Sequence, residues 1–289
     1  MKIFRLDHII NTVLVAVIMM AFPLLSGIEF LEPIFVHLKN FELTDINYKD
    51  IGGKDIGDAK IILVSSARLD ALKADSLLHK LNTGANKPKV IGMETIYSAK
   101  SDSYAGVFIE NAKKFDNLVF ADSLEKYDPE TDGFQSVYKS CDTIPPYIPT
   151  GFKNILTNLS KEHFTVREYH PSLAAGGVTV ESFSSQVVKK YDTNAYNALK
   201  SRGNDIETIN YKGGSFSELD YETIMSEGHR VDFRDKIVLI GNYYKDKNEF
   251  TSCVLSDLYF TPMNDRYSGK AFPDMYGVEI GRASCRERV

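Results

Sequence analysis

Residues 60–65, with the sequence KIILVS, decide the fold of this chain, because they form a short apolar run bounded by polar residues. Such a run is typical of a strand buried on both faces of a parallel sheet. Residues 70–81, DALKADSLLHKL, follow with Leu and Ala at helical spacing, and residues 89–93, KVIGM, form a second apolar run. This order predicts a strand, a crossover helix and a second strand, which together make one βαβ unit.

The same alternation continues along the chain. A helix over residues 104–115 and a strand over residues 117–121 would complete a second βαβ unit, and both crossovers should be right-handed. Later expected elements are a helix at 179–191, a strand at 208–211, a helix at 217–225 that opens at a Ser cap, and a buried strand at 236–241. Between residues 125 and 177 no period dominates, so we expect long loops there, with room for an edge hairpin. The predicted fold class is α/β, mainly a parallel sheet with crossover helices, preceded by one transmembrane helix.

The composition limits the classes of protein to consider. The chain has 289 residues, of which 43% are apolar and 25% charged, as in an ordinary globular protein. With 34 basic and 39 acidic residues its net charge is -5. A nucleic-acid partner is therefore not expected, because nucleic-acid binders usually carry a basic face.

Residues 9–28, IINTVLVAVIMMAFPLLSGI, carry no charge, and twenty helical residues cross a hydrocarbon layer of about 30 Å. One alternative is a helix buried in a soluble core, but such helices rarely run this long without a charge. The other is a cleaved signal peptide, but the apolar run is longer than its usual core and no clear cleavage site follows. Lys2 and Arg5 precede the run while Glu29 and Glu32 follow it, which favours an N-terminus in the cytoplasm. We expect residues 1–8 in the cytoplasm and a membrane anchor at 9–28, with the rest outside the inner membrane.

The last residues, 281–289 (GRASCRERV), differ from what precedes them, and EIGRASCRERV resembles a translated sequencing adapter joined to a truncated reading frame. We interpret them as a non-native tail. A genuine basic tail is the alternative.

Several segments, in order, resemble the CHASE2 domain. They include FRDKIVLIG at residues 233–241 and MYGVEI at 275–280, with shorter pieces at 59–64, 89–94, 209–213 and 261–262. The resemblance implies an extracytoplasmic sensory domain of a bacterial membrane receptor over residues 29–280, and no enzyme within this chain. It also implies that further membrane helices and an output domain, such as a kinase or cyclase, follow residue 280. Ser65, Ser66 and Arg68 depart from the family, where acidic residues often follow the first strand, and the family's Trp-Pro element is absent.

A ligand is expected at the carboxyl ends of the parallel strands, because open α/β sheets leave a crevice there. The candidate ligand-binding residues at these ends are Ser65, Ser66, Arg68, Glu94, Thr95, Asp122, Asn242 and Tyr243. Arg68 and Asn242 would hold an anionic or polar group through hydrogen bonds. In the alternative interpretation, Glu94 and Asp122 only cap the following loops or pair with Arg68.

Motifs of catalysis and metal binding are weak. The sequence contains no G-x-S-x-G, Walker, G-x-G-x-x-G or H-E-x-x-H motif, so no catalytic residue, cofactor or metal ligand is assigned. Asp128 to Gly133 imitate the start of a calcium loop, but Lys139 stands where a bidentate Glu is required. Outside the tail, Cys141 and Cys253 would either form a disulfide in an oxidising compartment or remain two thiols.

Two further functions stay open beside the sensor. An envelope hydrolase on an α/β fold is one, and a structural envelope protein without a ligand is the other. For a sensor, the expected partners are the membrane, an unknown small-molecule or protein signal, the missing C-terminal helices or output domain, and a second copy of the chain in a homodimer.

Overall fold

The computed structural model describes residues 12–15, 17, 60–65, 69–95, 97, 103–128, 130, 133–139, 144–155, 166–209, 216–227, 230–241, 258–259 and 276–277. Within the predicted membrane span, the described residues 12–15 and 17 are helical. None of the helices in the described part of the chain is both long enough and apolar enough to cross a bilayer.

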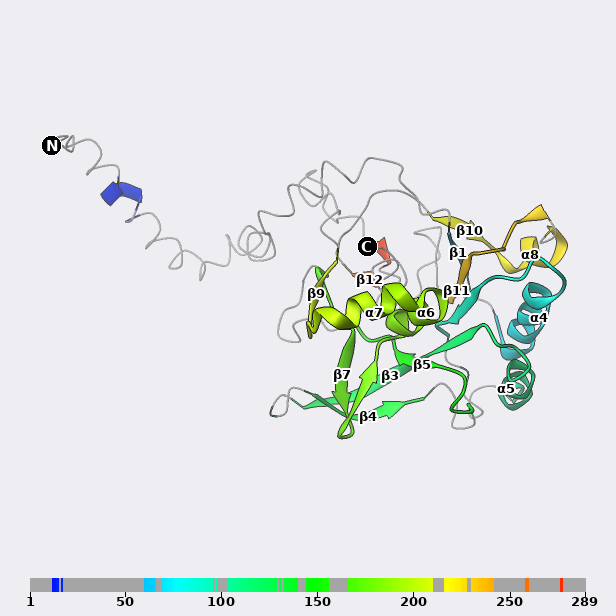
Figure 1. Ribbon diagram of the computed structural model, residues 1–289, viewed down its shortest axis with the longest axis horizontal. Helices are drawn as coiled ribbons and strands as arrows, with labels where there is room; N and C mark the ends of the chain where they lie inside the picture. The colour runs from blue at the N-terminus through cyan, green and yellow to red at the C-terminus, as the bar shows by residue number, and fades with distance from the viewer. Residues whose placement is uncertain are drawn as a thin grey trace, which may run out of the picture.

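A parallel sheet forms the centre of the molecule (Figure 1). In spatial order its strands are β10 (Ser217–Leu219), β1 (Ile61–Ser65), β11 (Ile237–Gly241), β2 (Val90–Met93), β3 (Leu118–Asp128) and β5 (Thr150–Phe152). The strand latest in the chain, β11, lies between β1 and β2, with Ile61 opposite Ile237 and Ile237 opposite Val90. The predicted fold class, α/β with a mainly parallel sheet, is confirmed.

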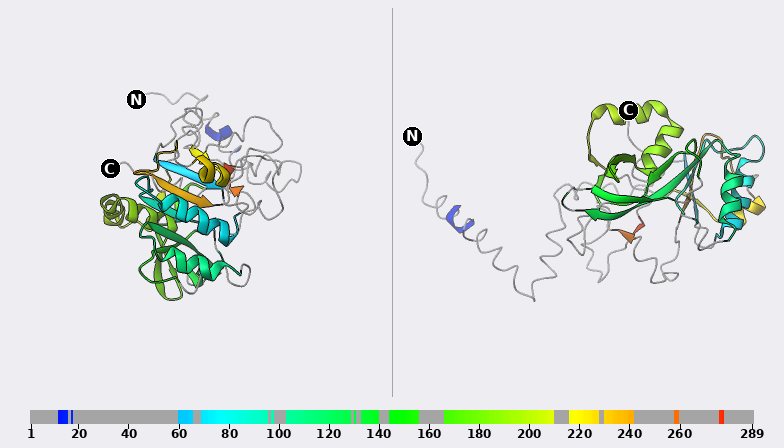
Figure 2. Two further views of the ribbon diagram at one scale, coloured as in Figure 1. Left: turned by 90° about the vertical axis from the view of Figure 1, so that its right-hand side faces the viewer. Right: turned by 90° about the horizontal axis from the view of Figure 1, so that it is seen from below.

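Helices cover both faces of this sheet (Figures 1 and 2). On one face α4 (Ala71–Asn82), α5 (Ala105–Ala112) and α8 (Tyr221–Glu227) pack on alternate strand residues such as Val64, Met93 and Ile240. On the other face α6 (Phe183–Tyr191) packs through Phe183 on the intervening strand residues. The strands are therefore apolar on both faces, which explains the continuous apolar runs in the sequence.

The parallel sheet continues into an antiparallel part through β3. Beyond Asp122, β3 pairs with β4 (Gly133–Tyr138), and β4 meets a hairpin of β7 (Ser172–Ala175) and β8 (Val178–Glu181). The hairpin turns at Gly176 and Gly177, whose φ values of 58° and 78° suit glycine. Two small antiparallel pairs lie outside this sheet: β6 (Glu168–Tyr169) with β9 (Glu207–Thr208), and β12 (Leu258–Tyr259) with β13 (Tyr276–Gly277).

Helix starts are set by short polar side chains. The carboxylate of Asp70 accepts a hydrogen bond from the Lys73 N–H at the start of α4, and Asp192 caps α7 (Thr193–Arg202) in the same way. Ser182 caps α6 by accepting from the Ser185 N–H, and its hydroxyl also lies within hydrogen-bond distance of the Tyr169, Ser184 and Ser185 hydroxyls. A buried hydroxyl cluster thus fixes where α6 begins.

Several expected elements are confirmed, and others are wrong. The strands at 60–65, 89–93 and 236–241 and the helices at 70–81 and 104–115 form as predicted, within a few residues. Residues 217–219 form strand β10 instead of opening a helix, and residues 179–181 belong to β8. The stretch 125–177, where we expected long loops with room for an edge hairpin, contains the hairpin of β3 with β4 and also the short strands β5, β6 and β7, which we did not expect. Helix α7 was not predicted.

Candidate functional site

The carboxyl edge of the parallel sheet brings together part of the predicted ligand-binding set. Ser65 ends β1 and lies opposite Gly241, which ends β11, while Glu94 and Thr95 follow the last residue of β2. Asp122 lies on β3, opposite Phe152 of β5. The parallel pairing of these strands, therefore, collects the hydroxyl and carboxyl side chains at one edge.

Glu94 is the best-defined side chain of this edge. Its backbone N–H donates to the Ile240 carbonyl at 2.8 Å, which ties the end of β2 to β11. Its carboxylate lies so close to Gly241 that a Cβ added to that glycine would overlap with Oε2. The Lys153 Nζ lies 3.9 Å from the Glu94 Oε1, and both side chains are about 30% exposed. Glu94 is thus a partly screened carboxylate that depends on Gly241 for its position.

We predicted that Asp122 directly follows the end of a strand, and this prediction is wrong. β3 runs on to Asp128, so Asp122 lies within the strand, at the point where β3 changes from the parallel to the antiparallel part of the sheet. Asp122 is only 1% exposed, and its backbone carbonyl accepts a hydrogen bond from the Lys153 backbone N–H at 2.9 Å. Asp122 is therefore a buried residue next to the edge and is not on its surface.

The other predicted residues, Ser66, Arg68, Asn242 and Tyr243, lie outside the described residues, as do Cys141 and Cys253. Lys153 was missed by the sequence reasoning, because the short strand before it lies in the Pro-rich stretch that we interpreted as loop. In the described ranges no group of three or more His, Cys, Asp or Glu side chains is placed to hold a metal ion.

Another polar cluster lies where α6 begins. Gln186 donates to the Glu181 carboxylate at 2.9 Å, and the Lys189 and Lys200 ammonium groups lie 3.6 and 3.8 Å from it. The Tyr196 hydroxyl also donates to Glu181, and burial together with this carboxylate raises the pKa of Tyr196. These contacts join β8, α6 and α7, so we assign the cluster a structural role.

Two hollows of the described surface lie at the opposite, amino edge of the sheet. One, a shallow hollow of about 660 Å³ that is wide open to solvent, is lined by Lys87, Pro88, Lys89, Asp116, Asn117, Lys190, Arg234 and Asp235. These residues come from the segments that enter β2, β3 and β11 and from the last turn of α6. A second hollow of about 210 Å³ adjoins it, because both are lined by Asp116 and Lys190.

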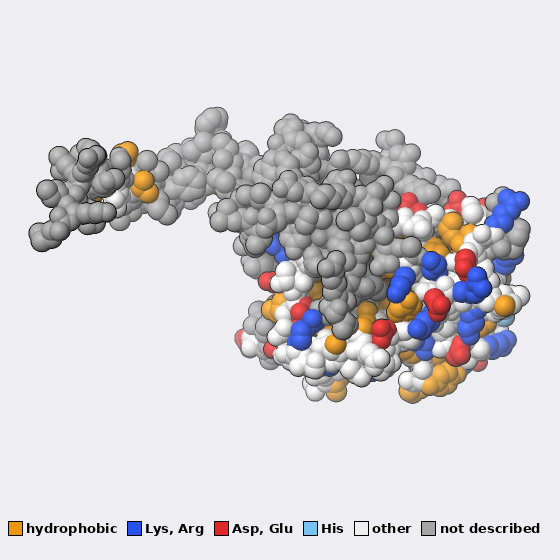
Figure 3. Space-filling model, turned by 45° about the horizontal axis from the view of Figure 1, so that its top comes forward, with side chains coloured by type: hydrophobic (Ala, Val, Ile, Leu, Met, Phe, Trp, Pro, Cys, Tyr) orange, Lys and Arg blue, Asp and Glu red, His pale blue; other side chains and the backbone are white. Residues whose placement is uncertain are grey.

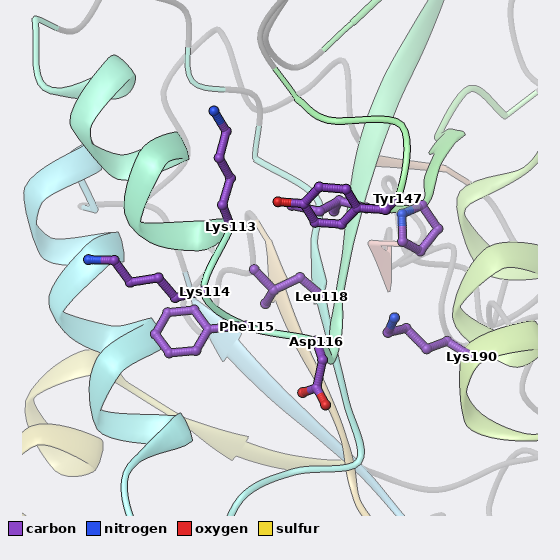
Figure 4. A pocket seen from close by; sticks show the side chains of 9 residues that line it. Lys113, Lys114, Phe115, Asp116, Leu118, Tyr147 and Lys190 are labelled. Carbon is purple, nitrogen blue, oxygen red and sulfur yellow. The ribbon is translucent and has the colours of Figure 1, made fainter.

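Figure 4 shows how the smaller hollow is built. The Lys190 side chain extends into it from α6. On the other side lie Leu118, the first residue of β3, and Asp116, which precedes this strand. Tyr147 lies across from Lys190, whereas the ammonium group of Lys114 points away. Lys190 is therefore the basic group that both hollows share.

Most of the shifted pKa values belong to this amino edge. The Lys87 ammonium, hydrogen-bonded to Asp116 at 2.5 Å, lowers the pKa of that carboxyl, and burial lowers the pKa of Lys190. A two-pronged pair with Arg234 lowers the pKa of Asp232 to about 2 and raises the pKa of Arg234. The Asp232–Arg234 pair is exposed and is an ordinary surface ion pair, whereas Asp116 and Lys190 line both hollows, so these hollows are a second candidate site.

Charge elsewhere on the surface is mixed. In Figure 3 the Lys and Arg side chains alternate with Asp and Glu on the right-hand part of the molecule, where Figure 1 places α4, α5 and α8. The larger hollow has an excess of positive charge, since four basic side chains and only two carboxylates line it.

Comparison with known proteins gives one family. The family model described as CHASE2 domain matches residues 45–283. No curated protein and no solved structure matches the chain.

Proposed function

The chain belongs to the CHASE2 domain family of extracytoplasmic sensory domains, and on this premise we propose that it is the membrane-anchored sensory part of a bacterial receptor. It would detect a signal outside the inner membrane and relay it inward. The observation that carries the proposal is the family match over residues 45–283, which includes every described strand.

We assign residues 1–8 to the cytoplasm, residues 9–28 to a transmembrane anchor, residues 29–280 to the sensory domain and residues 281–289 to a non-native tail. Support for the anchor comes from the uncharged run and from Lys2 and Arg5 on its N-terminal side. The relay requires two conformations of the domain with different affinity for the signal. Its proposed partners are the downstream membrane helices or output domain and a second copy of the chain.

For the signal, we propose the carboxyl edge around Glu94 as the binding site. The support is positional: Glu94 contacts Gly241, the last residue of β11, and the chain continues from there toward residue 280 and the membrane segments expected beyond it. A ligand that moves the Glu94 carboxylate would therefore act on the segment that leads to the output.

Membrane topology gives the first test. The full-length chain is expressed in a bacterium, and protease is added to spheroplasts and, separately, to inside-out membrane vesicles. We expect digestion in spheroplasts and protection in the vesicles, because the folded body lies outside. Recovery of the uncleaved chain in the aqueous fraction of lysed cells, or the opposite digestion pattern, would contradict the proposal.

Ligand response gives the second test. Thermal-shift screening of the full chain with small molecules should give compounds that raise the melting temperature of the wild type and of the control Glu130→Gln, in which an exposed carboxylate is removed. Glu94→Gln should lose this response. A hit that stabilises all three proteins equally would exclude Glu94 from the site, and the absence of any hit would favour a structural envelope protein.

A further inference from the structure

The larger hollow at the amino edge has two ammonium groups that no carboxylate neutralises by contact. Lys87 is paired with Asp116, and Arg234 is paired with Asp232. Within the described residues, Lys89 and Lys190 form no ion pair, and the contact of Lys89 is with the face of the Tyr191 ring, 4.6 Å from its centroid. The chain as a whole is acidic, with a net charge of -5, so this basic hollow is a local exception.

The hollow is also held in shape by contacts that do not use these two ammonium groups. Asn117 is 3% exposed, and its side-chain amide donates to the Pro88 carbonyl at 2.9 Å, which links the entries of β2 and β3. The Tyr191 hydroxyl donates to the Asp235 carbonyl at 3.1 Å, which links the end of α6 to the turn before β11. The walls are therefore preformed, and Lys89 and Lys190 remain available to a ligand.

Burial lowers the pKa of Lys190, the nearby Asp116 carboxylate opposes this shift in part, and the charge of Lys87 adds to it. A positive group that is partly desolvated gains stability when an anion binds next to it. Lysine presents a point charge and is a common phosphate-binding residue. The alternative role of Lys190, compensation of the helix dipole at the end of α6, needs no hollow and leaves Lys89 unexplained.

We propose that the larger hollow at the amino edge of the parallel sheet, lined by Lys89 and Lys190, binds a phosphate group. The proposal goes beyond the sensory function, because phosphate binding here holds whether or not the domain relays a signal. The phosphate belongs either to a small soluble molecule or to the head group of an anionic lipid.

The test uses the full chain in nonionic detergent and inorganic phosphate as the probe, followed by ³¹P NMR or calorimetry at constant ionic strength. We expect saturable binding that Lys190→Gln and Lys89→Gln each weaken by about tenfold, the loss of one charge-assisted hydrogen bond. Lys139→Gln is the matched control, since it removes one charge from an exposed residue outside the hollow and should bind like the wild type.

A conservative variant separates binding from folding. Lys190→Arg keeps the positive charge, so it should retain phosphate binding within a few fold, and its melting temperature is compared with that of Lys190→Gln. Equal binding by the Gln variants and the Lys139→Gln control would overturn the proposal. So would the absence of saturable phosphate binding by the wild type.

The two sources of phosphate are separated by adding phosphatidylglycerol to the micelles. If the hollow takes a lipid head group, this lipid should weaken the apparent affinity for inorganic phosphate, and Lys190→Gln should remove the competition. If the source is soluble, the affinity should not change. Either result is compatible with the phosphate site and names its natural ligand class.

Discussion

The contact between Gly241 and Glu94 shows how a missing side chain positions a charged one. Glu94 follows β2, and its carboxylate occupies the space that a side chain at the end of β11 would fill. The nearest atom is the end of a flexible side chain, so a larger residue at position 241 would displace the carboxylate and leave the backbone in place. Position 241 therefore controls where Glu94 lies.

Gly241→Ala should lower the free energy of unfolding by about 1 kcal/mol, the low end of overpacking costs, because the partly exposed Glu94 carboxylate can turn aside, and it should move Glu94 away from Lys153. Urea denaturation measures the change. In a Glu94→Ala background the same glycine substitution should cost much less, because the obstructing carboxylate is gone. Equal costs in the two backgrounds would show that the clash is not with Glu94.

The pair of Asp232 and Arg234 gives a prediction for pH. The pKa of Asp232 is lowered to about 2 by Arg234, so the pair stabilises the fold above the ordinary carboxyl pKa of 3.8. This contribution is lost as the pH falls from about 4 through about 2, when the carboxylate is protonated. Carboxyl-detected NMR titration should show the pKa of Asp232 return toward 3.8 in Arg234→Gln; an unchanged low pKa would mean that another group holds it down.

At the residue scale the sequence predicted which side chains stand at strand ends, but not their surroundings. Ser65 and Glu94 could be placed because each directly follows an apolar run. The roles of Gly241 and Lys153 depend on which strands are neighbours, and the sequence pattern does not contain that information. We predicted that Asp122 follows β3, but it lies inside this strand, because β3 extends past its apolar run to Asp128 and is partly exposed there.

Among the elements, β5 and α6 approach each other unusually closely. A Cβ added to Gly151 would be 2.6 Å from the backbone of Ser182 and Phe183, and Phe152 forms an isolated bridge with Ser182. Backbone atoms, unlike a flexible carboxylate, cannot move aside alone. Only glycine at position 151 allows β5 to reach the start of α6.

Gly151→Ala should therefore destabilise the fold by about 3 kcal/mol, at the upper end of overpacking costs. The matched control is Gly106→Ala in α5, where an added Cβ meets no atom within 4 Å. Because alanine favours a helix over glycine, this control should raise stability by about 0.5–1 kcal/mol. Chemical denaturation of both variants decides the matter, and similar effects from the two substitutions would refute the steric argument.

The elements that we did not predict from the sequence are those in which tertiary contacts outweigh the local preference of the residues for a helix or a loop. Residues 217–219 begin with a serine and a glutamate, as a helix does, yet they extend along β1 as strand β10. The helix starts after Asp220, whose carboxylate accepts from the Thr223 N–H at 2.7 Å. By contrast, the buried strands and α4 were predictable, because their apolar period agrees with their burial.

For the whole molecule, the central position of β11 makes the sheet depend on a late part of the chain. Val238 is fully buried within this strand, between β1 and β2. A carboxylate introduced at position 238 would be cut off from water among apolar side chains, and burying it would cost several kcal/mol. That cost is comparable with the whole stability of a domain.

Val238→Asp should abolish cooperative thermal unfolding, as followed by circular dichroism. Val178→Asp, the same substitution at a residue of β8 that is 62% exposed, should melt within a few degrees of the wild type. A cooperative transition of Val238→Asp at the wild-type temperature would mean that β11 is dispensable to the sheet.

The order of strands is also the global feature that the sequence alone did not predict. Each strand was recognisable from its apolar run. The sequence KIVLIG, however, does not indicate that β11 lies between β1 and β2, which precede it by more than a hundred residues. Insertion is favoured there because β11 is apolar on both faces, and only a central place in the sheet buries both.

This arrangement has a consequence for the newly made polypeptide. As the ribosome extends the chain, β2 can pair with β3, but β1 must wait with both of its edges open until β11 and β10 have been synthesised. Open edges of this kind recruit other strands. The nascent protein is therefore most exposed to self-association late in its synthesis, and a chaperone that shields β1 until then should raise the yield of folded molecules.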